Sequence, residues 1–509
     1  MGEERDSGAG AGVTFILFGA TGDLARRKLL PALYHLWTRN AIDRSMQIVA
    51  VSRRPMDDDG YRAYARAALK EFIGADADAR EIDGFVRGIV HARVDIEQPQ
   101  DFATLAQVVE QSESAMESRG HRFFYLAIAP DHVAMTVAGI QAVGLTSTSG
   151  WKRLVIEKPF GVDRVSAQKL NDALYTAFVE DEVFRIDHYL GKEMVQNIEV
   201  LRFANSLFET VWNNQTIANV QITSSETVGV MERAGYYEQA GAIRDMVQNH
   251  MLQMVMMVAM EPPSRLKMEA IRDEKVKVLR SLRRFDTPAE IAESVVRGQY
   301  VAPAGADPDV RPYRAEAGVA PSSMTETFVA ARLYIDNFRW AGVPFYIRTG
   351  KRMQVKATEI VVQFRDMPKQ LYFNKDGNLP PNRLVIRIHP VEGMSLCLCA
   401  KHPGRDESVV PITLDFSQET DASYDAYERL LQDALVGDST YFTRWDEVSL
   451  AWRFIDPIAQ VFAQAAELPL HPYAVGTMGP TAAYDLVGRD GVKWWPVYGE
   501  SSPVERGRN

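Results

Sequence analysis

Apolar runs and helical patterns alternate through the first third of the chain. Short segments rich in β-branched and aromatic residues have the composition of buried strands, and helical spacing follows the first of them at 24–37. The expected strands are 13–18, 47–51, 122–127 and 153–156. Strands that alternate with helices of this length predict a parallel sheet covered by helices on both faces.

Beyond about residue 190 the pattern changes, because several apolar runs leave no room for a helix between them. This spacing predicts a mixed, mainly antiparallel sheet in a larger second part of the chain. Helices are expected at 241–259, 424–435 and 445–468, and a connector at 302–318. The expected strands of this part are 219–223, 328–335, 344–348, 359–364, 383–388 and 394–398.

Composition excludes several classes of protein. The chain has 509 residues and a formal net charge of −10, which argues against general nucleic-acid binding. The longest apolar run, 251–260, is too short to span a membrane. The first 12 residues are polar and flexible rather than signal-like, so we expect a cytoplasmic protein whose two cysteines are reduced core thiols. The large second sheet can support self-association, and we expect a homodimer or homotetramer.

A glycine-rich turn follows the first predicted strand and opens the first predicted helix. It reads Gly19-Ala-Thr21-Gly22-Asp23-Leu24. Glycines at such a turn let the backbone approach a pyrophosphate, which the helix N-terminus stabilises. The spacing differs from the common GxGxxG pattern, and an ordinary strand-to-helix turn remains the alternative.

Two arginines, Arg53 and Arg54, stand where the second strand is expected to end. A site for NAD usually has Asp or Glu there, to accept a hydrogen bond from the ribose 2′-hydroxyl. Guanidinium groups suit a 2′-phosphate instead, since arginine binds phosphate oxygens bidentately. This pattern favours NADP over NAD, with a solvated pair of arginines as the alternative.

Basic residues recur beside glycines near the ends of expected strands. Together they could surround a phosphate monoester, which carries about −1.5 to −2 charges at neutral pH. Any one of these lysines, taken alone, is more simply a solvated surface charge. The residues are Lys158, His188, Lys192, Lys351 and Lys356.

His250 lies in an otherwise largely apolar helical stretch. A half-buried imidazole held by a carboxylate suits a general base, because its reference pKa is about 6.5. A core histidine with satisfied hydrogen bonds is the alternative, and the residues alone leave the choice open.

Five motifs in this order resemble the glucose-6-phosphate dehydrogenase family. They are Gly19-Ala-Thr-Gly-Asp-Leu-Ala25, Glu157-Lys-Pro-Phe-Gly161, Arg185-Ile-Asp-His-Tyr-Leu-Gly-Lys-Glu193, Ile243-Arg-Asp-Met-Val-Gln-Asn-His250 and Arg348-Thr-Gly-Lys351. The resemblance implies a Rossmann-like dinucleotide-binding domain at 13–185 and a β+α domain for substrate binding and oligomerisation at 186–509. It also implies oxidation of β-D-glucose 6-phosphate at C1 to 6-phospho-D-glucono-1,5-lactone with NADP⁺, the first step of the oxidative pentose phosphate pathway.

The resemblance further implies roles for individual residues. His250 matches the catalytic base and Asp187 the carboxylate that orients it. Arg54 beside Arg53, and the lack of a tyrosine near residues 129–133, depart from some relatives. The residues that match substrate contacts are Lys158, His188, Tyr189, Lys192, Glu226, Asp245, Lys351 and Lys356. Those that match cofactor contacts are Gly19, Thr21, Gly22, Asp23, Leu24, Arg53 and Lys158, and Lys28 lies in the same region; no metal site is predicted.

Two other functions stay open. Another NADP-dependent sugar or polyol dehydrogenase would turn over unphosphorylated glucose as readily as the phosphate ester. A non-catalytic sensor of sugar phosphates would keep the lysines but could dispense with Asp187 and His250.

Overall fold

The computed structural model describes residues 12–500 except 75–77, 117, 119, 304, 306, 308–309, 375–376, 378, 405–408, 417–424 and 465–467. The predicted lead-in at 1–12 therefore lies almost wholly outside the described residues. The chain divides into two compact units. The first contains the described residues within Met1–Gly191, Arg265–Arg272 and Ala422–Ser449, and the second those within Lys192–Ser264, Asp273–Asp421 and Leu450–Asn509.

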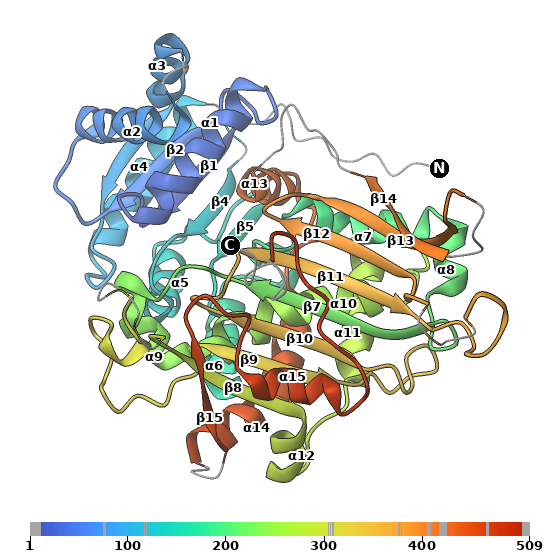
Figure 1. Cartoon of the computed structure of the whole chain (residues 1–509). Helices are drawn as coiled ribbons and strands as arrows, with labels where there is room; N and C mark the ends of the chain where they lie inside the picture. The colour runs from blue at the N-terminus through green and yellow to red at the C-terminus, as the bar shows by residue number, and fades with distance from the viewer. Residues whose placement is uncertain are drawn as a thin grey trace. The chain divides into compact units, whose positions relative to one another are not determined.

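A six-stranded parallel sheet forms the centre of the first unit (Figure 1). Its strand order, β3-β2-β1-β4-β5-β6, places β1 between β2 and β4. The order reverses at β1, where open α/β sheets bind ligands beyond the carboxyl ends of the strands. The strands are β1 (Val13–Phe18), β2 (Gln47–Ser52), β3 (Ile89–Arg93), β4 (His121–Leu126), β5 (Lys152–Ile156) and β6 (Val183–Arg185).

Helices cover this sheet because the strands are apolar on both faces. A late segment of the chain joins them, since α13 (Ala426–Val436) packs against α1 (Leu30–Thr38). The buried Glu428 carboxylate on α13 accepts from Arg39 Nη1 at 2.7 Å and contacts His35 Nδ1 at the same distance. The other helices of the unit are η1 (Ala25–Leu29, a π-helix), α2 (Asp58–Ile73), α3 (Ala79–Arg87), α4 (Asp101–Ala115), η2 (Pro130–His132), α5 (Val133–Ala142), α6 (Arg164–Tyr175) and η3 (Glu180–Glu182).

The second unit is built on a nine-stranded sheet with the order β14-β13-β12-β11-β7-β10-β9-β8-β15 (Figure 1). Only β7 with β10 and β8 with β15 run parallel, so the predicted mixed, mainly antiparallel sheet is confirmed. The strands are β7 (Ile217–Ser225), β8 (Val295–Val301), β9 (Phe328–Leu333), β10 (Phe345–Gly350), β11 (Ala357–Phe364), β12 (Arg383–His389), β13 (Gly393–Lys401), β14 (Val409–Phe416) and β15 (Leu470–Ala474).

Helices pack on this sheet at several places. α7 (Glu193–Phe203) contacts β12, α10 (Leu252–Ala259) contacts α7, and α15 (Thr481–Gly488) contacts β8 and β9. The remaining helices of the second unit are α8 (Ser206–Val211), η4 (Met231–Arg233), α9 (Ala234–Ala242), η5 (Ile243–Met251, a π-helix), α12 (Pro288–Ser294), η6 (Tyr313–Ala315) and η7 (Tyr372–Asn374). Two further helices, α11 (Met268–Ser281) and α14 (Trp445–Gln464), begin in segments of the first unit and continue in segments of the second.

Two predictions need correction. Cys397 and Cys399 are free thiols on β13, but both are partly exposed, so they are not core residues. The reason is that β13 lies one strand from the sheet edge, beside the largely exposed β14. The described part of 302–318 is not all irregular, since it includes the short helix η6. Among the described residues, no helix combines the length and apolar character needed to cross a membrane.

Candidate active site

The glycine-rich turn at the end of β1 requires glycine at its first position. Gly19 has φ +74°, and a Cβ there would collide with the carbonyl oxygen of Ala127. Gly22 N–H donates to Gly19 O at 2.8 Å, which closes the turn before η1 begins. Tyr61 and Tyr64 donate their hydroxyl hydrogens to the carbonyls of Ala20 and Thr21 at 2.8 and 3.1 Å. These hydrogen bonds hold the turn in place, while Gly22 and Asp23 remain exposed.

Arg53 and Arg54 follow β2, the neighbour of β1 in the sheet. Val51 pairs with Phe18, so both arginines lie at the same edge as the glycine-rich turn. Both are exposed, and no described carboxylate lies within 4.0 Å of either. The turn and the arginines fit a dinucleotide whose 2′-position is anionic. Lys28, in contrast, pairs with Asp425 at 2.9 Å.

The first unit also holds part of the predicted substrate site, at the carboxyl ends of β5 and β6. Lys158 lies just beyond the end of β5, and the peptide bond that joins it to Pro159 is cis. Asp187 is buried, and its Oδ1 accepts from the Tyr189 N–H at 3.0 Å. His188 is partly exposed and its ring meets that of Tyr189 edge to face at 4.9 Å. These four predicted residues thus share one edge of the parallel sheet.

Sequence reasoning missed a role for Glu157 in this region. Its carboxylate accepts from Tyr125 Oη at 2.6 Å, and Tyr427 on α13 also donates to it. Burial raises the pKa of Glu157, while the two tyrosine hydroxyls and Lys158 oppose that rise. The buried carboxyl therefore anchors the Lys158 segment to β4 and α13.

Four residues of the second unit lie along one edge of the nine-stranded sheet. Glu226 follows β7, Lys351 follows β10, Lys356 precedes β11 and His389 ends β12. The register pairs Ser225 with both Gly350 and Ala357, and Thr358 with His389, so these ends are adjacent. Neighbouring strands are about 4.8 Å apart, so the row extends over about 15 Å.

Acidic groups gather at the β7 and β10 end of this row. Lys351 Nζ donates to the Glu226 carboxylate, and its ammonium lies 5.1 Å from the centre of the Tyr237 ring. Asp245 is buried and accepts from Tyr236 Oη at 3.1 Å. Burial, with the nearby carboxylates of Asp245, Glu326 and Glu226, raises the pKa of Tyr237. The predicted sugar-binding residues Glu226, Asp245 and Lys351 are thus brought together.

Asp245 and His250 both lie on η5, a π-helix of nine residues that contacts β10. π-helical turns inside helices are rare and frequently occur at functional sites. Before it, Gly241 has φ +60°, and a Cβ there would collide with the Glu326 carboxylate. That carboxylate accepts from Ile243 N–H at 3.1 Å, which satisfies a free donor at the start of the helix. His250 is 1% exposed, so its imidazole is more deeply buried than the half-buried one that would suit a general base.

Positive charge gathers at the opposite end of the row. Burial, followed by the nearby charges of Lys192 and Lys356, lowers the pKa of His389 to about 4. Lys192 stands at the N-cap of α7, which contacts β12, the strand that ends in His389. Two predicted phosphate-side residues therefore share a neighbour, His389, that the sequence reading did not select. The sequence feature that could have indicated His389 is its position between an expected strand and Pro390.

The two halves of the predicted site belong to different units. Asp187 lies in the first and His250 in the second, so the orientation of His250 by Asp187 stays a prediction. It likewise stays a prediction that Lys158, His188 and Tyr189 bind the same substrate molecule as the residues of the second unit.

Family models match nearly the whole chain. Residues 16–197 match the glucose-6-phosphate dehydrogenase NAD binding domain, and residues 199–495 match the C-terminal domain of the same family. A glucose-6-phosphate 1-dehydrogenase of Bacillus subtilis is 49% identical over 95% of this chain and 98% of its own length. One from Mycolicibacterium smegmatis is 43% identical over 94% of this chain and 97% of its own.

Solved structures give the same result. A glucose-6-phosphate dehydrogenase in complex with its substrate glucose-6-phosphate superposes with a TM-score of 0.88 at 32% identity, over 96% of this chain and 99% of that one. A glucose-6-phosphate 1-dehydrogenase from Mycobacterium avium gives 0.82 at 34% identity, over 96% and 100%.

The fold and the matched models define an oxidoreductase with a nicotinamide-dinucleotide-binding domain. The chain belongs to the glucose-6-phosphate dehydrogenase family.

Proposed function

We propose that this protein oxidises β-D-glucose 6-phosphate at C1, with NADP⁺ as hydride acceptor, to 6-phospho-D-glucono-1,5-lactone. This is the first step of the oxidative pentose phosphate pathway. The observation that carries the proposal is the separation of charge along one sheet edge in the second unit. Lys192 and Lys356 lie near His389 at one end, and Glu226, Lys351 and Asp245 lie at the other.

The basic end suits the phosphate of the substrate. A phosphate monoester carries about −1.5 to −2 charges at neutral pH, so two ammonium groups nearly balance it. His389 is neutral at that pH because its pKa is about 4, and a neutral imidazole N–H can still donate to a phosphate oxygen. Binding energy obtained there would fix the sugar at a distance from the reacting carbon and so assist turnover as well as affinity.

The acidic end suits the hydroxyl groups of the sugar. Carboxylates accept hydrogen bonds from hydroxyls, and the ammonium of Lys351 can donate to a hydroxyl or ring oxygen. Lys351 and Glu226 are paired in this structure, which holds both side chains in place before substrate binds.

His250 is the proposed general base. Hydride can leave C1 readily only as the C1 hydroxyl loses its proton, so a base must reach that hydroxyl. The imidazole would take this proton at one ring nitrogen while the other is held by a carboxylate, which the family resemblance assigns to Asp187. The bound dinucleotide supplies the hydride acceptor.

The proposed choice of NADP⁺ is supported by Arg53 and Arg54. Both are exposed beyond β2, at the edge where the glycine-rich turn lies. A 2′-phosphate would meet two guanidinium groups there, whereas a 2′-hydroxyl would find no carboxylate at the end of β2.

The test is the near-ultraviolet absorbance of reduced nicotinamide with the purified full chain. Glucose 6-phosphate and glucose are each combined with NADP⁺ and NAD⁺. We expect rapid reduction of NADP⁺ with the phosphate ester and, at equal concentration, much slower reduction with glucose. Equal rates with both sugars would favour a general sugar dehydrogenase, and no reduction with any pair would favour a non-catalytic sensor.

A further inference from the structure

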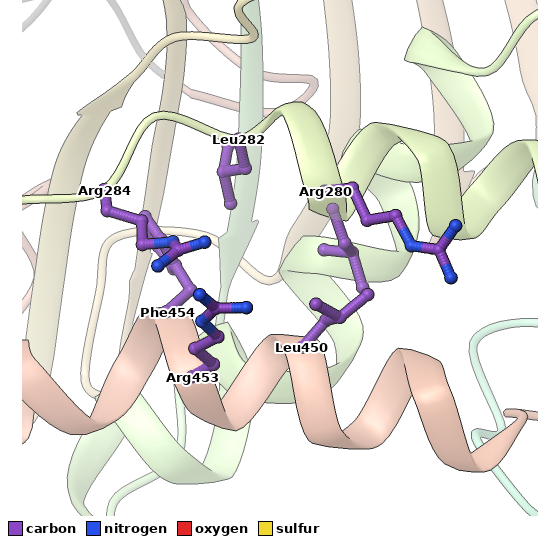
Figure 2. A pocket seen from close by; sticks show the side chains of 7 residues that line it. Arg280, Leu282, Arg284, Leu450, Arg453 and Phe454 are labelled. Carbon is purple, nitrogen blue, oxygen red and sulfur yellow. The ribbon is translucent and has the colours of Figure 1, made fainter.

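A small pocket in the second unit lies apart from the sheet edge that carries the predicted site residues. It encloses about 320 Å³ between the end of α11, the segment that follows it and α14 (Figure 2). This volume is at the lower end of the range found for small-molecule sites. None of the residues that line it has a part in the proposed reaction.

Apolar side chains form one side of the pocket. Leu279, Leu282 and Phe454 are buried, and Leu450 is partly exposed. The Phe454 ring packs against Phe285 with the centroids 5.6 Å apart. Leu282 forms a β-bridge with Ile335, which fixes the segment after α11. This side of the pocket is therefore apolar and is held in place by the ring contact and the bridge.

Three arginines also line the pocket. Arg280, Arg284 and Arg453 are exposed, and among the described residues no carboxylate lies within 4.0 Å of any of them. The adjacent Arg283 differs, because it makes two hydrogen bonds to Asp336 at 3.0 and 2.6 Å. Figure 2 shows the guanidinium groups of Arg284 and Arg453 extending into the same space, with Arg280 on the far side of the leucines.

Two like charges directed into one space repel each other, and an anion between them removes that repulsion. The arrangement stands out in a chain whose net charge is −10. A bare inorganic anion would leave the partly exposed Leu450 in water, and a neutral hydrocarbon would leave the guanidinium groups without partners. Only a ligand with both features satisfies both sides of the pocket.

We propose that this pocket binds a small amphiphilic anion. Its acidic group, a carboxylate or phosphate, lies between Arg284 and Arg453. Its aliphatic body covers Leu450 and lies beside Leu282 and Phe454. The ligand class is thus a short fatty acid or an alkyl phosphate.

Calorimetric titration of the full chain with octanoate tests this assignment. The variants are Arg284→Gln and Arg453→Gln, and the matched control is Arg311→Gln. Arg311 is also exposed but lies outside the pocket, so its loss changes the net charge equally. Titration with 1-octanol tests the need for the negative charge, and a repeat with saturating NADP⁺ separates this pocket from the dinucleotide site.

We expect octanoate to bind wild type, and its Kd to rise at least fivefold in each pocket variant and to stay unchanged in Arg311→Gln. We also expect 1-octanol to bind at least tenfold more weakly and NADP⁺ to have no effect. The proposal is overturned if wild type does not bind octanoate, if all three variants bind alike, or if NADP⁺ displaces it. Oxidation of glucose 6-phosphate in the absence of octanoate, measured in the same variants, should equal that of wild type and shows that they are folded.

Discussion

Lys351 and Glu226 form an ion pair between the ends of two parallel strands, β10 and β7. The lysine side chain is 11% exposed and the glutamate side chain 33%, so the pair is partly shielded from water. The pair links two of the residues to which the family resemblance assigns contacts with the sugar. It also places a charged donor and a charged acceptor side by side at one end of the sheet edge.

We predict that Lys351→Met and Glu226→Gln act as a unit. Each single change leaves the other charged group without its partner in a partly buried place, so each should lower kcat/KM by about 10² or more. The double variant should lose much less than the product of the two single losses, because the pair is removed together. Steady-state kinetics of the four proteins checks this, and multiplicative losses would show that the two side chains act independently.

Lys356→Ala should raise the pKa of His389. Burial is the largest cause of the low His389 pKa of about 4, and the positive charges of Lys192 and Lys356 lower it further. Removing the Lys356 charge leaves a histidine that is more easily protonated. NMR titration of the His389 ring, assigned by its loss in His389→Gln, gives the measurement.

The same substitution should raise KM for glucose 6-phosphate about tenfold and leave turnover of free glucose unchanged, since only the ester presents a phosphate. Lys369→Ala, which removes an exposed lysine elsewhere in the second unit, is the control. An unchanged His389 titration, or equal effects on both sugars, would contradict phosphate binding at this end.

Arg53→Ala should weaken NADP⁺ selectively. We expect KM for NADP⁺ to rise at least tenfold while KM for NAD⁺ changes less than twofold, because only the former has a 2′-phosphate. The KM for NADP⁺ of Arg54→Ala, measured in parallel, shows how much each of the two exposed arginines contributes to NADP⁺ binding. Parallel losses for both coenzymes in Arg53→Ala would refute the assignment.

Asp433 makes stability depend on pH. Burial and the charge of Asp438 raise its pKa to about 7, well above the value of about 4 expected in the unfolded chain. Stability from this group is therefore fully present below about pH 4 and is lost as pH rises through about 7. Because the side chain is partly exposed, we expect Asp433→Asn to gain only about 1–2 kcal/mol over wild type at pH 8 and little at pH 5. Urea unfolding at the two pH values measures this, and an equal difference at both would show that Asp433 does not titrate in this range.

Much of the fold follows from local pattern. The strand at 13–18 was predicted with the bounds that β1 has, because six apolar or β-branched residues precede a glycine turn. β8 was missed because Arg297, Gly298 and Gln299 interrupt its apolar run. In the structure Arg297 is buried and donates to the carbonyls of Phe462 and Leu468 at 2.8 and 2.7 Å. Those partners are far away in sequence, so no local pattern predicts them.

The candidate site follows from the sequence only in part. The sequence singles out the recurring lysines and the His250 stretch as candidates, and in the structure Lys192 and Lys356 share a neighbour, His389. The π-helical form of η5 was not found, because Gly241 and Glu326 set its start through a tertiary contact. His389 was missed because two tertiary contacts place it beside the lysines. The register of β11 with β12 brings it near Lys356, and the packing of α7 on β12 brings it near Lys192.

The central claim is that His250 is the base in oxidation of glucose 6-phosphate, and His250→Asn tests it most directly. His471→Asn, which changes a partly buried histidine on β15, is the control. We predict that His250→Asn lowers kcat for NADP⁺ reduction by about 10² or more and leaves the affinity for glucose 6-phosphate nearly unchanged. A kcat within threefold of wild type would contradict the account.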